Sequence, residues 1–442
     1  MGVDRHSCAL SVIFRPMQSD PTPPPDALPV EEPTHANAPP PDNGGKEPRV
    51  PSVPIPGDGG GSVSTLTEEE PAPDGGVRAD VALWAVVLAG GIGSRFWPLS
   101  SPERPKQLLS LVGDRPLIAD TIARLSPLVP ADRVLVVTSR DIAAPLRAAI
   151  PEVPEENMLI EPHPLGTAAA LAWGAQEVAR RAGPETVFCT MHADLAVAFP
   201  DEFRRVLRQA AAVAAMDSHL VAIGARPTRA ETGFGYLLPG MPLDADASGG
   251  HEGPAPVVRF VEKPGVILAE TLIGEGALWN TGIFVWRSKV VLDALTRHTA
   301  ELWPGLEALQ ARDYERFAGM IQHVSMERGL LERSEEVVVL PAEFGWDDVG
   351  TWAALRRVRD LDDTGNGGFG PVHFVDCTSN VVHCEAGTVV AYGVSQLLLV
   401  CLDGLTFVTT LDRATELNSL LERLPEEVRR KYDARGSKRT KS

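Results

Sequence analysis

Cysteine is scarce in this sequence, and its pattern excludes two kinds of small, cross-linked protein. Only five of the 442 residues are cysteine. Their number is odd and none are paired in a CxxC spacing, so neither a disulfide framework nor a zinc site is indicated. We expect most of them to be small buried apolar residues.

Basic residues are also outnumbered, and long hydrophobic runs are missing. Lysine and arginine total 41 against 59 acidic residues, a formal net charge of −18 at pH 7. A nucleic-acid partner is not expected, because binding without sequence preference needs a basic face. The apolar run at residues 8–14 is too short for a membrane span and lacks the features of a signal peptide. We therefore expect a cytoplasmic protein with no membrane partner.

Residues 1–80 differ in composition from the rest of the chain. They hold 16 of the 39 prolines and 13 acidic residues against 5 basic ones. Too few apolar residues are present to offset the entropy of ordering, so this segment is predicted to be a disordered, proline-rich acidic tail. We favour a dispensable extension, or a start codon placed too early, over a partner-binding arm.

Residues 81–364 alternate between short apolar runs and longer segments with helical spacing. This alternation predicts an α/β domain of Rossmann-like type, with a mixed, mostly parallel sheet and helices on both faces. Ligands of such sheets gather outside the carboxyl ends of the strands. The expected strands are 84–89, 133–138, 157–160, 186–190, 219–224, 257–262, 280–286 and 336–340, and the expected helices are 116–127, 140–149, 167–182, 200–216, 288–298, 304–311 and 350–360.

A second, smaller domain is predicted over residues 365–430. The glycines at 365–368 indicate a flexible break, after which short β-rich runs follow. These runs are 372–375, 379–384, 388–392, 397–402 and 405–410, and a helix is expected over 413–424. Residues 431–442 form a basic tail.

A glycine-rich stretch with two cations follows the first expected strand of the larger domain. Glycine lets backbone N–H groups approach an anion closely, and the added cations suit a highly charged phosphate chain. The stretch has no Walker ending, and three prolines delay any helix. The next strand ends in Ser139 and Arg140, without the acidic residue that a dinucleotide fold places on the ribose, so a nucleoside triphosphate is favoured. The candidate phosphate-binding residues are Gly90, Gly91, Gly93, Ser94, Arg95 and Lys106.

Carboxylates follow two later strands. Glu161 could accept hydrogen bonds from N1 and N2 of guanine, with Gly166 and Thr167 letting the base lie against the backbone. The alternative is an exposed carboxylate at a helix start. Asp194 follows the strand at 186–190 and is a candidate Mg2+ ligand, because Mg2+ binds through one or two carboxylates and substrate phosphates. The neighbouring His192 is interpreted as a packed loop histidine.

The stretch GGIGSRFWPLSSPERPKQLL, residues 90–109, resembles the signature of the sugar-1-phosphate nucleotidylyltransferases. Within it, WPLS at 97–100 and PKQ at 105–107 resemble the mannose-1-phosphate guanylyltransferase branch of that family. Four separate motifs fall in the family's order between residues 86 and 424, and their joint occurrence is far more specific than any one motif.

The resemblance implies further site residues. TGFGY at 232–236 and VEKP at 261–264 are similar to family motifs at the sugar, so Gly235, Glu262 and Lys263 are expected to bind the sugar phosphate, together with Asn280. Asp194 aligns with the family's metal aspartate, although His192 and Leu195 replace a proline and a histidine of the motif. Asp348 aligns with the second metal ligand, the alternative being that Asp347 or Asp348 caps the helix at 350–360.

The family implies a function and an assembly. We expect transfer of GMP from GTP to α-D-mannose 1-phosphate, giving GDP-mannose and pyrophosphate by in-line attack assisted by Mg2+. Arg95, Lys106 and Lys263 are the expected catalytic cations. A different sugar 1-phosphate, such as glucose 1-phosphate, a different nucleoside triphosphate, or a non-catalytic homologue that binds nucleotide-sugar are the alternatives. The small domain is expected to be β-helix-like and to assist formation of a homodimer.

Overall fold

The computed structural model describes residues 82–91, 94–101, 104–243 and 253–428, which belong to one compact unit. The interpretations of residues 1–80 and 431–442, as well as Cys8 and Gly93, lie outside this part of the chain. Among the described cysteines, Cys189, Cys377 and Cys384 are buried and Cys401 is half-buried, all as free thiols. No helix of the described ranges is long and apolar enough to cross a membrane.

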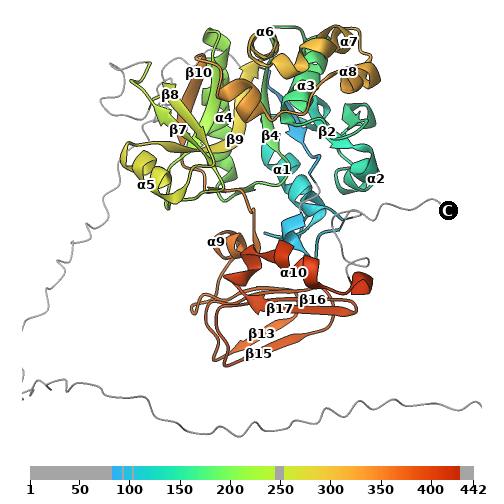
Figure 1. Cartoon of the computed structure of the whole chain (residues 1–442), viewed down its shortest axis with the longest axis vertical. Coiled ribbons are helices and arrows are strands. Elements are labelled where there is room, and N and C mark those ends of the chain that lie inside the picture. Colours follow the sequence, from blue (N-terminus) through green and yellow to red (C-terminus); the bar gives the residue numbers. More distant parts are fainter. Residues whose placement is uncertain (1–81, 92–93, 102–103, 244–252, 429–442) are drawn as a thin grey trace, which may run out of the picture. The chain divides into compact units, whose positions relative to one another are not determined.

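The larger domain is built on a nine-stranded mixed sheet, which confirms the expected α/β fold (Figure 1). Strands β3, β2, β1 and β4 are parallel, and β9 runs antiparallel between β4 and β6. Strand β10 is parallel to β6, and the β8–β7 hairpin completes the sheet. In spatial order the strands are β3 (Met158–Glu161), β2 (Val134–Ser139), β1 (Trp84–Leu88), β4 (Val187–His192), β9 (Leu278–Arg287), β6 (Leu220–Ala225), β10 (Val337–Ala342), β8 (Ala255–Glu262) and β7 (Gly235–Pro239).

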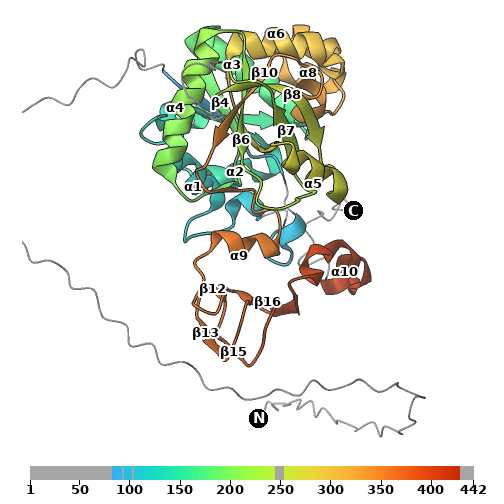
Figure 2. The ribbon, with the colours of Figure 1, turned by 90° about the vertical axis from the view of Figure 1, so that its left-hand side faces the viewer.

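Helices cover both faces of the sheet because alternate residues of its strands point to opposite sides. Ala85 and Val87 of β1 pack with α1 (Leu117–Leu125), α2 (Arg140–Ala149) and α4 (Pro200–Met216). Val86 and Leu88 pack with α3 (Thr167–Ala182), α6 (Ser288–His298), α7 (Leu306–Gln310) and α8 (Tyr314–Met320) on the other face. In Figure 2, α4 lies on one side of the sheet and α8 on the other.

Several elements of this domain differ from the prediction. Helices α5 (Val266–Gly274) and α8 were not expected, nor was the π-helical turn Glu327–Leu331. The helix expected over 350–360 is a 3₁₀ turn, Trp352–Ala354, followed by the single turn α9 (Leu355–Val358). Helix α9 ends at Val358 because Arg359 adopts an extended backbone. The buried Arg359 guanidinium donates to the carbonyls of Leu111 and Val382.

The smaller domain consists of parallel strands that alternate along the chain between two sheets. Strands β12 (Gly367–Phe369), β14 (Val381–Cys384) and β16 (Leu397–Leu402) lie in one sheet, which β17 (Leu405–Thr410) closes in antiparallel fashion. Strands β13 (Val372–Val375) and β15 (Val389–Tyr392) form the other. The chain therefore coils as a short β-helix-like stack, followed by a 3₁₀ turn (Arg413–Thr415) and helix α10 (Leu417–Arg423) in place of one longer helix.

The flexible break expected at residues 365–368 is wrong, since β12 begins at Gly367 and Asn366 before it is buried and hydrogen-bonded. A buried asparagine pair explains the order there. The Asn366 side chain donates to the carbonyl of Cys377 and accepts from the backbone N–H of Asn380, while Gly367 donates to the Asn380 carbonyl. These bonds tie the start of the small domain to its next turn.

Candidate active site

Two adjoining cavities open at the carboxyl ends of β1, β4 and β3 and beside β9. The first, of about 430 Å³, is lined by Arg95, Phe96, Lys106, His192, Asp194, Leu195, Gly233, Phe234, Gly235, Glu262, Asn280, Thr281, Gly282, Glu327, Trp346, Asp348 and Gly350. The second, of about 290 Å³, is lined by Leu88, Ala89, Gly90, Gly91, Lys106, Gln107, Val137, Glu161, Pro164, Leu165, Gly166, Thr167, Ala170, His192, Ala193, Asp194 and His323. Three residues line both cavities: Lys106, His192 and Asp194.

Lys106 lies at this junction and is almost completely buried. It begins the 3₁₀ turn Lys106–Leu108, and its Nζ lies 2.9 Å from Asp194 Oδ2 while donating to the Asp348 carbonyl at 2.9 Å. The adjacent Gln107 donates from Nε2 to the carbonyls of Ala89 and Gly91, at 3.0 and 2.9 Å. The glycine-rich turn and the lysine are thereby fixed to each other.

A two-stranded ribbon brings the two candidate metal ligands into one cavity. Strand β5 (Ala196–Val197) follows Asp194, and it pairs with β11 (Trp346–Asp347), which precedes Asp348. Burial by itself would raise the pKa of Asp194, but Lys106 and His192 outweigh it and the pKa is lowered. The pKa of Asp348 is raised, chiefly by burial, with Lys106 opposing and Asp347 and Asp194 adding to the increase.

These two carboxylates fit a magnesium site that phosphates complete. Among the described residues no group of three His, Cys, Asp or Glu side chains could hold a metal ion alone. Mg2+ is commonly held by one or two carboxylates, the substrate phosphates and water, so two aspartates that line one cavity would suffice once a phosphate is bound there. The helix-cap alternative is wrong, because Thr351 is at the N-cap position. Asp347 instead pairs with Arg357 at 2.7 Å, and Asp348 accepts from the backbone N–H of Gly350.

Glu161 reaches the second cavity from the end of β3 and is 5% exposed. Its Oε1 has no hydrogen-bond partner among the described residues. Burial raises the pKa of this carboxyl to about 7, against a smaller opposing contribution from the backbone N–H of Leu165. The alternative of an exposed helix-start carboxylate is therefore wrong, and the side chain offers an unsatisfied acceptor to a ligand.

The start of α3 packs on a segment that sequence reasoning missed. Gly166 has a φ of +92°, and a Cβ there would lie 2.4 Å from the carbonyl oxygen of Val324. Thr167 Oγ1 accepts from the backbone N–H of Met326 at 2.8 Å. The same segment places His323 in the second cavity and Glu327 in the first. No motif marks it in the sequence.

The residues predicted at the sugar lie around the first cavity, with one exception. Gly235 pairs directly with Glu262, and a Cβ on Gly235 would lie 2.8 Å from Glu262 Oε2. Asn280 is buried and accepts from the backbone N–H of Gly282. Lys263 is exposed, places its Nζ 2.8 Å from Glu262 Oε1, and is not among the described residues lining the cavity.

The remaining predicted residues lie where the glycine-rich turn meets the cavities. Gly90 and Gly91 line the second cavity, and the exposed Arg95 lines the first. The side chain of Ser94 is outside the described part. His192, interpreted from the sequence as a packed loop residue, is half-buried and lines both cavities. Gly282, with a φ of +70°, makes room for it, since a Cβ there would lie 3.2 Å from His192 Cδ2.

A family model described as nucleotidyl transferase matches residues 84–364, which include both cavities. The chain belongs to the nucleotidyl transferase family. The resemblance stated from the motifs, and with it the expectation of a nucleotidyltransferase enzyme, is confirmed at this level.

Individual relatives are similar over most of their length. A Klebsiella pneumoniae protein named mannose-1-phosphate guanylyltransferase is 30% identical over 363 residues, covering 79% of this chain and 75% of the relative. A Sinorhizobium fredii protein of the same name is 28% identical over 367 residues, covering 80% and 70%. A Thermus thermophilus crystal structure, titled mannose-1-phosphate geranyltransferase, matches with a TM-score of 0.71 and 32% identity, covering 77% of this chain and 99% of that one.

Proposed function

We propose that this nucleotidyltransferase transfers the guanylyl group of GTP to α-D-mannose 1-phosphate, releasing pyrophosphate. The observation that carries the proposal is the junction of the two cavities. A nucleotide in the second cavity and a sugar phosphate in the first would meet beside Lys106 and Asp194, which line both. The names of the relatives support mannose 1-phosphate and a guanine nucleotide as the pair.

The residues support a single displacement without a covalent enzyme intermediate. A phosphate oxygen of the sugar phosphate forms a bond to the α-phosphorus of GTP, while the bond from that phosphorus to the β-phosphate bridging oxygen breaks. Pyrophosphate leaves with the electron pair, so catalysis consists of positioning and charge neutralisation. In this proposal Lys106 and Arg95 hold the leaving phosphates, and Lys263 turns from Glu262 to the incoming phosphate. Asp194 and Asp348 would hold Mg2+, which supplies further neutralisation of phosphate charge.

Guanine selection is assigned to Glu161. An ionised carboxylate can accept from the two adjacent donors N1–H and N2–H of guanine, a pair that adenine and uracil do not offer. The unpartnered Oε1 in the second cavity supports this assignment. Gly90, Gly91, Gly166 and Thr167 form the adjoining wall, where Gly166 leaves room for the base.

We also propose a homodimer, as the family resemblance implies. Its support is the outer side of the β13–β15 sheet, where Val375, Val390 and Tyr392 are 47%, 67% and 71% exposed. We retain the expectations of a cytoplasmic location and of small-molecule substrates, with no nucleic-acid or membrane partner.

A pyrophosphate-release assay tests the reaction over a grid of substrates. GTP, ATP, UTP and dTTP are each combined with mannose 1-phosphate and glucose 1-phosphate, with and without Mg2+. We expect the highest kcat/KM with GTP, mannose 1-phosphate and Mg2+. Equal or faster turnover with UTP and glucose 1-phosphate would overturn the substrate assignment. The Glu161→Gln variant tests the assignment of guanine to this carboxylate, and its preference for GTP over ATP should fall about tenfold or more.

A further inference from the structure

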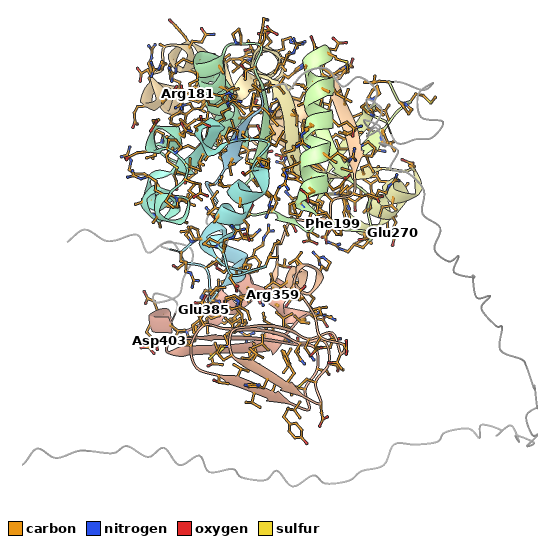
Figure 3. All side chains as sticks on the ribbon, turned by 180° about the vertical axis from the view of Figure 1, so that it is seen from behind. Arg181, Phe199, Glu270, Arg359, Glu385 and Asp403 are labelled. Carbon is orange, nitrogen blue, oxygen red and sulfur yellow. The ribbon has the colours of Figure 1, made fainter. Side chains whose placement is uncertain are left out.

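The segment that carries Lys106, residues 104–111, contacts the small domain directly on one side of that lysine and through Arg359 on the other. Arg104 precedes Lys106 by two residues, and both of its terminal nitrogens donate to Glu385, at 2.6 and 2.7 Å. Leu111 follows Lys106 by five residues, and its carbonyl accepts from Arg359 Nε at 2.7 Å. Figure 3 shows Arg359 and Glu385 at the meeting point of this segment and the C-terminal strands.

The two contacts are connected by a histidine that is completely buried. His383 Nδ1 lies 2.9 Å from Arg359 Nη2, and its Nε2 lies 3.3 Å from Glu385 Oε1. Arginine is only a donor, so Nδ1 must be the acceptor, and the proton of the neutral ring is on Nε2, facing Glu385. One continuous chain of hydrogen bonds therefore runs from Arg104 through Glu385 and His383 to Arg359, and each bond in it joins one donor to one acceptor.

Aromatic packing supports this chain. The His383 ring stacks on Phe369 with a centroid distance of 4.4 Å, and Arg359 lies over the same Phe369 ring at 5.7 Å. Trp97, which lies before Lys106 in the stretch at residues 90–109, is held in a similar way, because Trp352 donates from Nε1 to the Trp97 carbonyl and Trp97 packs edge-on against Phe407. The loop is thus fixed at several points by residues that follow the sheet in sequence.

We propose that the small C-terminal domain holds the Lys106 segment in its substrate-binding geometry, directly through Glu385 and indirectly through Arg359, which follows α9 and bonds to Val382 and His383 of the small domain. Both are positioning residues, because they act through Arg104 and Leu111 and neither lines the described part of the two cavities. This inference rests on the proposed function insofar as Lys106 binds phosphate. On this proposal the small domain positions a residue of the active site in its own chain, and this role is separate from any role in forming a dimer.

The test is a double-mutant cycle in the full chain with Arg104→Gln, Glu385→Gln and the double variant. The ion pair is partly exposed, with side chains 41% and 26% accessible, so a modest effect on folding and a larger one on the loop are expected. Arg115→Gln is the control, because it removes an arginine from the same stretch whose partner is Asp120 of the large domain. Steady-state kinetics with GTP and hydrogen exchange over residues 104–111 are measured for each.

Each single variant should lose about fivefold in kcat/KM, and the double variant should lose no more than about twofold beyond that. Hydrogen exchange of residues 104–111 should quicken in both single variants and stay unchanged in the control. Single variants within twofold of wild type, a double loss near the product of the two, or unchanged exchange would each overturn the inference. If the wild-type protein proves inactive over the whole substrate grid, the proposed function fails, and the exchange measurement decides the inference without it.

Discussion

Lys106 combines a proposed catalytic charge with a structural one. Lys106 is 7% exposed, and its ammonium neutralises Asp194, which shares the cavity with Asp348. We predict that Lys106→Ala lowers kcat/KM about a hundredfold or more, the usual loss for a charge aimed at a transition state. It should also lower the free energy of unfolding by roughly 2 kcal/mol, because the Asp194 carboxylate loses its partner.

Because Arg95 is exposed, its variant allows the loss of activity to be measured apart from a loss of stability. Arg95→Ala should lower kcat/KM to a similar degree with an unchanged free energy of unfolding. Pyrophosphate release and urea denaturation measure the two quantities. Turnover of either variant within a few-fold of wild type would contradict the assignment of that cation.

Glu161 should make the stability of the ligand-free protein depend on pH. Its pKa is about 7 when folded and 4.5 when unfolded, so the folded state binds this proton more tightly. The contribution is present below pH 4.5 and is lost as pH rises through 7, by an amount of roughly 3 kcal/mol. Glu161→Gln cannot ionise, and should equal wild type near pH 4.5 and exceed it above pH 8. Urea denaturation at several pH values measures this difference, and a difference that does not change with pH would refute the raised pKa.

At the scale of secondary structure, α3 offers a matched pair of glycines. Gly166 precedes the helix at φ +92°, and Gly183 follows it at φ +100°. A Cβ on Gly166 would collide with the Val324 carbonyl, while one on Gly183 would meet no atom of the described residues within 4 Å. Both alanine variants carry a backbone strain of about 1–3 kcal/mol. Only Gly166→Ala adds the collision.

We therefore predict that Gly166→Ala destabilises the protein more than Gly183→Ala does. Because Gly166 also lines the second cavity, its variant should weaken GTP binding at least tenfold, while Gly183→Ala binds as wild type. Thermal unfolding and calorimetric titration with GTP measure the two effects. Equal losses in both variants would show that Val324 yields and that the close approach is not required.

The elements that sequence reasoning found are those whose pattern is local. Strand β1 is a continuous apolar run, and α3 is bounded by glycines at both ends, so both were placed within one residue. The missed elements depend on distant partners. Strand β12 contains two glycines and is ordered by bonds to Asn380, and α8 is a short helix that closes over the α3 face of the sheet.

The same distinction holds for the candidate site. The sequence could predict that Gly90, Glu161 and Asp194 lie near one another, because the parallel strands that precede them bring their carboxyl ends to one edge. The position of His192 between the cavities, and the segment of Val324 and Glu327, could not be predicted. These positions depend on which loops pack together, and no residue spacing in the sequence indicates that packing.

On the scale of the whole molecule, the small domain would serve both the segment that carries Lys106 and a second copy of the chain. Val390 and Tyr392 of β15 point outward with Val375 of β13, in an apolar strip that nothing in the described chain covers. Isolated exposed apolar residues are ordinary, but a row of them on adjacent strands suits a symmetric contact between copies.

We predict that the wild-type protein sediments as a dimer at micromolar concentration and that a Val390→Glu, Tyr392→Glu double variant sediments as a monomer. Two buried carboxylates without partners would oppose association, because their desolvation is not compensated. Val408→Glu is the matched control, since Val408 is 52% exposed on β17, a strand of the other sheet. The monomeric variant should keep kcat/KM within about twofold, because the residues lining both cavities come from one chain. A monomeric wild type would overturn the dimer, whereas a monomeric but inactive variant would mean that the second copy supports the site.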